Sequence, residues 1–497
     1  MRTELHRVRS DCYKLLFGTE GKKEETLELV VPDRCGDIVK ILDVRGQLFL
    51  SSKKLKDGEA ELCSRAELCV IFSSENGEIE YVPAQLSIEQ SFTMADIPED
   101  CQLIANVRMA SLDARALNPR KLLIRVECCA SVCCYAPDSF TLWDGFCESE
   151  APAAYIQRKE LSHNLITDMR EKSFTISDEY SLPAKYAGAK MLSAETELCV
   201  YDSKPVGNKL VFKVNANTTA LFLNPEDDSL FKCDFTTQFS QIIEIEACEE
   251  TECIVLAALK ETEFVALPER ELPCFSMRLT MLAQAMCVKS VCSVYVSDAY
   301  STSCELNCES ERVHYWRMSA HQRLRIPLKG KLPFKGDSDC VIYLAPIAAS
   351  CRAEGARVIC TVQLCGIGQG EESEPFPIKL TLSAEEALSL AAGEKLLLHN
   401  LCCEPVCIEK DCDVSLVVTA DFCVVCEDEV CAISALEFGE ACSCEELPAL
   451  TVLITPGKHD TWTLAKKYRS TEELIIAANR CGEDFDVCRR PLLIPRA

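Results

Sequence analysis

Cysteine is the residue type in this chain with the widest choice of chemistry. The 497 residues include 34 cysteines, whose thiols can form disulfides, bind a metal ion or pack as small apolar groups. Two uses remain open. Most of the thiols can be buried hydrophobes, and some can cross-link later, when the compartment becomes oxidising. Metal binding is the weakest of the three uses, because no cysteine cluster has a convincing zinc spacing.

The cysteine clusters differ in what they can do. The four cysteines of 128–134 lie in a strand-like run, where successive side chains point to opposite faces and cannot converge on one ion. The two cysteines of 423–426 and the two of 442–444 come nearest to a zinc pattern, but Val424-Val425 favours a strand over a zinc knuckle. The cysteines of 402–412 lie in a polar, loop-like stretch, where disulfides are more plausible. We predict no metal site.

Catalytic motifs are scarce. None of the six histidines lies in an HExxH motif, and the chain has neither a P-loop nor a GxGxxG fingerprint. The glycines of 366–370 precede Glu371 and Glu372, which would repel a phosphate, so we expect a turn there. We therefore predict that the protein is not an enzyme and needs no cofactor, with a cell-wall hydrolase as a remote alternative.

The charge of the chain excludes some partners. The 78 acidic residues exceed the 52 basic residues, giving a formal charge of −26. This balance argues against binding to nucleic acid or to an anionic membrane, both of which need clustered Lys and Arg. The chain has no apolar run long enough to predict a transmembrane helix. Its N-terminal residues lack the apolar region of a secretory signal, so we expect a cytosolic protein.

Three anchors recur at intervals of about 150 residues and predict the elements that must position any site. They are an extended segment ending in proline, a glycine before alternating apolar residues, and a phenylalanine opening a second such stretch: Pro32, Pro183 and Pro333; Gly58, Gly207 and Gly355; Phe92, Phe239 and Phe376. Period-2 alternation indicates β-strands. We predict a mainly β protein with three sandwich-like repeats at 1–140, 155–298 and 301–440, joined by linkers near 138–160 and 298–320.

The C-terminal residues 450–497 have a different pattern. An apolar β run at 450–454 is followed by a helical segment at 461–468, in which Trp462 has the spacing of a core residue. Ser470-Thr471 before two glutamates is typical of a helix N-terminus. This second helix ends near Asn479, and 492–495 forms a returning strand. The segment is predicted to be a small βααβ domain.

The C-terminal segment resembles a LysM domain. The matching residues are Pro456-Gly457 after the first strand, Trp462 to Tyr468 on the first helix, Thr471 to Ile475 on the second, Asn479, and Leu492 to Pro495. LysM sequences usually have Gly-Asp-Thr-Leu-Trp after the first strand, where this chain has Lys458-His459-Asp460-Thr461-Trp462. The difference falls in one lip of the usual sugar groove.

The front of the chain resembles the sporulation-associated SPOCS family. The residues concerned are Leu29 to Asp33, Asp37 to Leu42, and Ser297-Asp298-Ala299-Tyr300-Ser301-Thr302 between the second and third repeats. Repeated units followed by one C-terminal LysM domain are also similar to that family. The second repeat departs from the pattern, since it has Leu182-Pro183-Ala184-Lys185 without the acidic start.

The resemblance implies a function in assembling the spore coat. Proteins with this layout are expected in the mother-cell cytoplasm at the forespore surface, with a protein partner, the coat-basement ATPase called stage IV sporulation protein A. A LysM domain otherwise binds glycans of N-acetylglucosamine, so a peptidoglycan-binding protein of the cortex or cell wall is the alternative. The three similar units also suit self-association.

The candidate binding residues are those of the two LysM-like loops. They are Pro456, Gly457, Lys458, His459, Asp460 and Thr461 in the first loop, with Asn479 at the second. Because no secretory signal is expected, we predict that these residues dock a protein rather than a glycan.

Overall fold

The structure is a computed structural model that describes most of the chain. The described residues are 5–94, 97–98, 100–146, 153–224, 226, 229–246, 251–267, 272–332, 340–354, 357–370, 374–409, 412–441, 448–454, 460–479 and 491–497. They are mainly β-strands, which confirms the mainly β character of the predicted fold. The two α-helices of this part both lie near the C-terminus.

The strands before the tail form three groups. Group 1 contains β1 (Leu5–Val30), β2 (Ile38–Lys56), β3 (Glu59–Ser74), β4 (Ile79–Thr93), β5 (Gln102–Asn118) and β6 (Lys121–Phe146). Group 2 contains β7 (Ala154–Ser181), β8 (Lys190–Val206), β9 (Lys209–Leu223), β10 (Leu230–Glu244), β11 (Thr251–Ala266) and β12 (Cys274–Ser301), with a 3-10 turn at Ala184–Tyr186. Group 3 contains β13 (Cys304–Lys331), β14 (Cys340–Glu354), β15 (Arg357–Gln369), β16 (Pro375–Ala387), β17 (Lys395–Cys403), β18 (Cys407–Ile408) and β19 (Asp413–Ala441).

The strand order is the same in the three groups. One sheet places the long last strand between the first strand and a shorter one, as in β1-β6-β5, β7-β12-β11 and β13-β19-β17. The other sheet is a three-stranded meander, as in β2-β3-β4, β8-β9-β10 and β14-β15-β16. All pairings are antiparallel.

Each group buries a core between its two sheets. In group 1, the inward residues Leu122, Ile124 and Val126 of β6 pack in one cluster with Val70 and Phe72 of β3. These residues alternate along their strands, because only every second side chain of a strand faces the core. Groups 2 and 3 have equivalent clusters. Each group is therefore a two-sheet sandwich.

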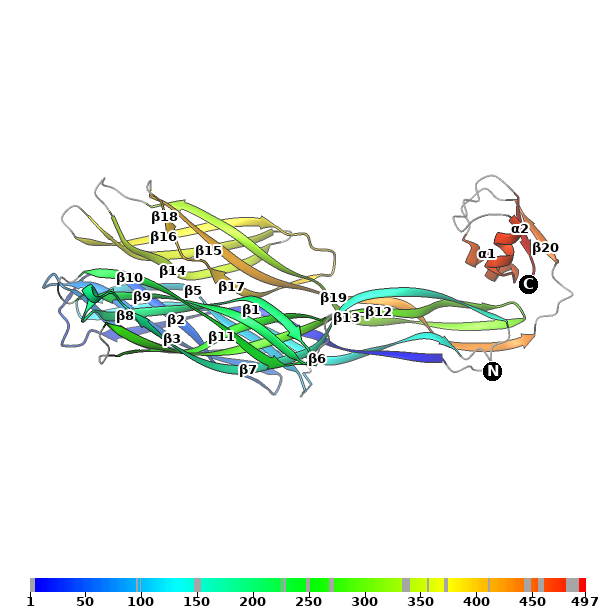
Figure 1. Cartoon of the computed structure of the whole chain (residues 1–497), viewed down its shortest axis with the longest axis horizontal. Coiled ribbons are helices and arrows are strands. Elements are labelled where there is room, and N and C mark those ends of the chain that lie inside the picture. The colour runs from blue at the N-terminus through cyan, green and yellow to red at the C-terminus, as the bar shows by residue number, and fades with distance from the viewer. Residues whose placement is uncertain are drawn as a thin grey trace.

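The first and last strands of each group extend beyond the sandwich as a long hairpin. The three hairpin ends form a stalk, made of residues 5–14, 136–146, 154–164, 290–301, 304–317 and 426–441. Figure 1 shows the sandwiches gathered at one end and the stalk leading from them to the C-terminal helices. The predicted linkers at 138–160 and 298–320 are therefore wrong, since their described residues lie mostly in strands. Cross-strand partners more than 100 positions away stabilise these strands.

The three groups pack against one another around a shared core. Leu15 and Tyr135 of group 1, Met286 of group 2, and Met318 and Val425 of group 3 belong to one buried cluster. Hydrogen bonds and an ion pair also join group 1 to group 2. The side-chain amide of Gln284 bonds to both backbone groups of Ala105, at 3.0 and 2.8 Å, and Arg45 pairs with Glu195 at 2.7 Å. The three sandwiches are thus held as one body.

The tail consists of β20 (Leu450–Leu453), α1 (Thr461–Tyr468), α2 (Glu472–Asn479) and β21 (Leu492–Pro495). Its two strands pair only with each other among the described residues. The order of strand, helix, helix and strand is the predicted one.

Two local predictions need correction. Gly366 to Gln369 belong to β15 and do not form a turn. Gly366 is needed there because a Cβ at this position would collide with the backbone of Tyr343 and Leu344 on β14. Cys402 and Cys403 are buried in β17, although the sequence around them suggested a loop.

Candidate functional site

The tail contacts the tip of the stalk through helix α1. The helix begins after Asp460, whose carboxylate accepts hydrogen bonds from the backbone N–H and the hydroxyl of Thr463 at 3.1 and 2.9 Å. This cap fixes the direction of the first turn. Trp462, Leu464 and Ala465 of this helix are buried. Lys466 lies four residues after Trp462, about one helical turn further along, so the two side chains are on the same face of the helix.

The apolar part of the contact is centred on Tyr300 of β12. Its ring meets the indole of Trp462 edge to face, with centroids 4.9 Å apart, and stacks on Tyr155 of β7 at 5.3 Å. Tyr300 is 4% exposed and lies in one buried cluster with Leu464 and Ile475 of the tail. Its hydroxyl donates to the backbone carbonyl of Ser470 at 3.0 Å. The stalk thus supplies part of the core of the tail.

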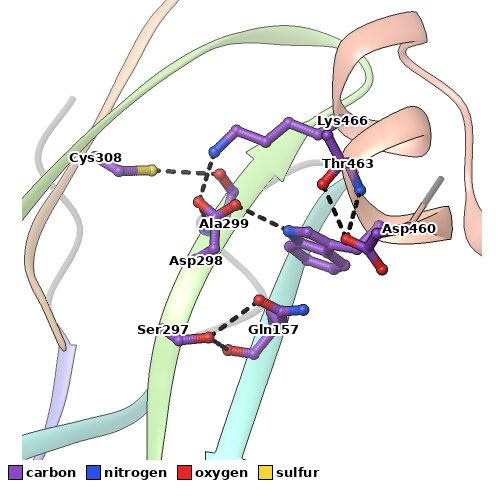
Figure 2. Close-up of polar contacts among 9 residues, drawn as sticks. Gln157, Ser297, Asp298, Ala299, Cys308, Asp460, Thr463 and Lys466 are labelled. Carbon is purple, nitrogen blue, oxygen red and sulfur yellow. Dashed lines mark hydrogen bonds and ion pairs between the residues drawn. The ribbon is translucent and has the colours of Figure 1, made fainter. Parts of the chain in front are cut away.

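The polar part of the contact is centred on Asp298. One carboxylate oxygen accepts a hydrogen bond from the indole Nε1 of Trp462 at 2.9 Å, and the other pairs with Lys466 Nζ at 2.5 Å. Figure 2 shows Asp298 on its strand, facing Lys466 of the helix. Burial alone would raise the pKa of Asp298, but hydrogen bonds from Lys466 and Trp462 outweigh it and lower that pKa below its usual value. The carboxylate is therefore ionised at neutral pH.

Neighbouring contacts hold this segment of β12 in place. The hydroxyl of Ser297 donates to the backbone and side-chain carbonyls of Gln157 on β7, at 3.2 and 3.1 Å. The thiol of Cys308 on β13 donates to the carbonyl of Ala299 at 3.4 Å. Both contacts are drawn in Figure 2. Strands from groups 2 and 3 therefore hold the residues on both sides of Asp298 in place.

The predicted binding residues divide into two sets. Pro456, Gly457, Lys458 and His459 lie outside the described residues. Asp460 caps α1, and the hydroxyl of Thr461 donates to Glu472 of α2 at 2.5 Å. The side-chain amide of Asn479 donates to Leu493 O at 2.6 Å and accepts from Leu493 N at 2.9 Å. These last three residues brace the tail, and the structure does not bring Asn479 and Thr461 into contact.

Sequence reasoning missed the partner of Trp462. The core position of Trp462 is confirmed, since the residue is 7% exposed. The acceptor for its indole N–H is Asp298, 164 positions earlier, and no local pattern connects the two. The sequence nevertheless pointed to the region of Asp298, because Ser297 to Thr302 is one of the segments that resemble the SPOCS family.

The tail leaves an apolar strip uncovered. Leu450 and Val452 of β20 are each 49% exposed, and Ile454, which directly follows the strand, is 77% exposed. Leu474 on α2 is 38% exposed. Contiguous exposed apolar side chains are typical of surfaces that bind another protein.

A separate cavity of about 240 Å³ lies where the three groups meet. It is lined by residues of every group, among them Arg108, Asn106, Glu197, Asn217, Ile347 and Asn400. Among its lining groups, burial raises the pKa of Glu197 to about 8 and lowers the pKa of His399 to about 4. The cavity is therefore part of the contact between the groups.

The described residues contain no cluster of three His, Cys, Asp or Glu side chains that could hold a metal ion. Within the same part of the chain, no helix is both long and apolar enough to cross a membrane.

No family model matches the chain, and neither a curated protein nor a solved structure matches it. The resemblance to the SPOCS and LysM families therefore remains a prediction that rests on the residues quoted above.

Proposed function

We propose that this chain is a non-enzymatic assembly protein of the spore coat. In this proposal the three strand groups are three SPOCS-like copies of one domain, and the tail is a LysM-like module that docks a coat morphogenetic protein. The protein acts in the mother-cell cytoplasm at the forespore surface. The expected partner is the coat-basement ATPase of the stage IV sporulation protein A type.

The contact between Asp298 and Trp462 is the observation that carries this proposal. It lies in the segment Ser297 to Thr302, which is one of the segments that carry the resemblance, and it joins the repeated part of the chain to the tail. A module held at the end of a long stalk is well placed to reach a partner while the sandwiches pack elsewhere.

The exposed strip on β20 favours a protein over a glycan as the ligand of the tail. Leu450, Val452 and Ile454 offer apolar area, which protein interfaces bury at their centres.

Two binding measurements on the full chain test this proposal. The chain is titrated into the purified ATPase of the same organism, and it is separately sedimented with insoluble peptidoglycan. We expect saturable binding to the ATPase and no co-sedimentation. Co-sedimentation without binding to the ATPase would overturn the proposal in favour of a peptidoglycan-binding protein.

A further inference from the structure

The cavity at the junction of the three groups has an unpaired carboxyl group on its wall. Glu197 lies on β8, is half-buried and belongs to the lining of the cavity. One of its oxygens, Oε1, accepts a hydrogen bond of 2.8 Å from the backbone N–H of Cys403. Within the described part of the chain, Oε2 has no hydrogen-bond partner, and Glu197 forms no ion pair. Oε2 is therefore available to a solute in the cavity.

The basic side chains on the cavity wall already have partners. Arg45 pairs with Glu195 at 2.7 Å, and Arg108 pairs with a glutamate of β1 at 2.8 Å. His399 also lines the cavity, and because it is 3% exposed, its lowered pKa of about 4 keeps the imidazole uncharged at neutral pH. Among the described residues, the wall therefore offers no free cation to Glu197.

The missing cation has an energetic consequence. A carboxylate enclosed by protein is costly to ionise unless a cation or several hydrogen-bond donors stabilise it. Burial accordingly raises the pKa of Glu197 to about 8, against the opposite effect of the hydrogen bond from Cys403. A ligand with its own positive charge supplies the missing partner, because a charged N–H donor binds a carboxylate more strongly than a neutral donor does.

The size and the other walls of the cavity limit the ligand. Its volume of about 240 Å³ lies below the ~300–1,000 Å³ of pockets for drug-sized molecules, so the ligand is small. Ile347 and Leu398 contribute apolar side chains to the wall, which suits an aliphatic chain. Pro405 is an exposed residue of the lining, which indicates that the cavity opens to solvent there. A metal ion fits less well, because the described residues contain no cluster of three side chains that could hold one.

We propose that this cavity is a binding site for a small aliphatic amine, whose ammonium group pairs with Glu197 and whose apolar part lies against Ile347 and Leu398. The ammonium donates to Oε2, while the backbone N–H of Cys403 continues to hold Oε1. Residues of all three groups line the cavity, so the amine binds only the folded chain and stabilises it by mass action.

The test titrates the full chain with n-butylamine in an isothermal titration calorimeter, at a pH close to the pKa of Glu197, which is about 8. n-Butanol has the same aliphatic chain without the charge and is the matched ligand control. We expect saturable binding of n-butylamine and at least about tenfold weaker binding of n-butanol. Glu197→Gln keeps an acceptor for the N–H of Cys403 but removes the charge, and it should also weaken the binding of n-butylamine at least about tenfold.

Two further variants make the result specific to the cavity. Asn217 on β9 is the register partner of Glu197, and both residues line the cavity. Asn217→Leu fills space beside Glu197 without changing the charge and should weaken the binding. Glu244→Gln removes an exposed carboxylate of the same group and should bind n-butylamine as the wild type does. The thermal midpoint of each variant shows whether it is folded.

The proposal is overturned if the wild-type chain shows no saturable binding of n-butylamine, or if n-butanol binds as tightly. It is likewise overturned if Glu197→Gln or Asn217→Leu is folded and keeps the wild-type Kd for n-butylamine. This inference does not depend on the function of the tail.

Discussion

The indole N–H of Trp462 donates a hydrogen bond of 2.9 Å to the carboxylate of Asp298, and this bond joins the tail to the stalk. Trp462 is buried, so its N–H needs a partner, and the stalk supplies it. Tyr300, two positions after Asp298, completes the contact by packing against the indole. The tail is therefore held by residues of group 2, although it follows group 3 in the chain.

Replacing Asp298 by Ala should loosen the tail. The change leaves the buried indole N–H unpaired and removes the partner of Lys466, at a cost of about 1–3 kcal/mol. Amide hydrogens of α1 in the full chain should exchange about 10- to 100-fold faster, as measured by hydrogen–deuterium exchange with mass spectrometry. Lys466→Ala is the matched control and should have a smaller effect, because an exposed ion pair contributes less than about 1 kcal/mol. Equal exchange in Asp298→Ala and wild type would contradict this role.

Replacing His399 by Gln should weaken the acid sensitivity of the fold. Burial, with a contribution from His321, lowers the pKa of His399 to about 4, against about 6.5 in the unfolded chain. The unfolded state therefore binds a proton that the folded state does not, and stability falls as pH drops from about 6.5 to about 4. Between pH 7 and 5, the free energy of unfolding from urea titrations should fall less in the variant, by about 2 kcal/mol. His6→Gln, which changes an exposed imidazole, should behave as wild type; an unchanged slope in His399→Gln would refute the prediction.

Replacing Gln284 by Leu should weaken the packing of groups 1 and 2. The amide of Gln284 donates to Ala105 O at 2.8 Å, and its oxygen accepts from Ala105 N at 3.0 Å and from Lys53 Nζ at 2.6 Å; a leucine side chain can make none of these bonds. Because Gln284 is 1% exposed, we expect a loss of about 2–4 kcal/mol in the free energy of unfolding, measured with urea. Gln85→Ala, on the exposed face of β4, should cost less than about 0.5 kcal/mol. Equal stability of the two variants would count against the bridge.

Replacing Gly366 by Ala should destabilise group 3. The new Cβ would lie within 2.9 Å of Leu344 Cα, and closer still to the carbonyl oxygen of Tyr343, so β14 and β15 would have to separate. We expect the free energy of unfolding to fall by about 2 kcal/mol or more. Gly145→Ala is the control, because its nearest contact is Arg158 Nη2 at 3.5 Å. Equal thermal midpoints for Gly366→Ala and Gly145→Ala would contradict this prediction, because they would show that β14 moves away from the new methyl group at little cost.

The parts of the fold that depend on local signals could be predicted from the sequence. The helix at 461–468 and the strand at 492–495 have the predicted bounds, because helix caps, apolar spacing and the flanking charges all act within a few residues. The mainly β character followed in the same way from the alternation of apolar residues. The cap formed by Asp460 is itself a local interaction.

The remaining features depend on contacts between distant residues. The hairpin ends of the stalk looked like linkers because their polar residues face water on one side, whereas their pairing partners lie more than 100 positions away. Gly366 looked like a turn residue because nothing near it in the sequence reveals the approach of Tyr343. The contact of Asp298 with Trp462 has the same cause. No spacing rule connects residues that only tertiary packing brings together.

The central claim is that the tail docks a protein through its first LysM-like loop. The most direct measurement is the Kd of the full chain for the purified coat-basement ATPase, compared between wild type and Lys458→Glu. The proposal predicts at least a tenfold weaker Kd for this variant, with an unchanged thermal midpoint, and an unchanged Kd for Lys467→Glu, which makes the same charge change on the exposed side of α1. Equal Kd values for wild type and Lys458→Glu, or no binding by either, would contradict it.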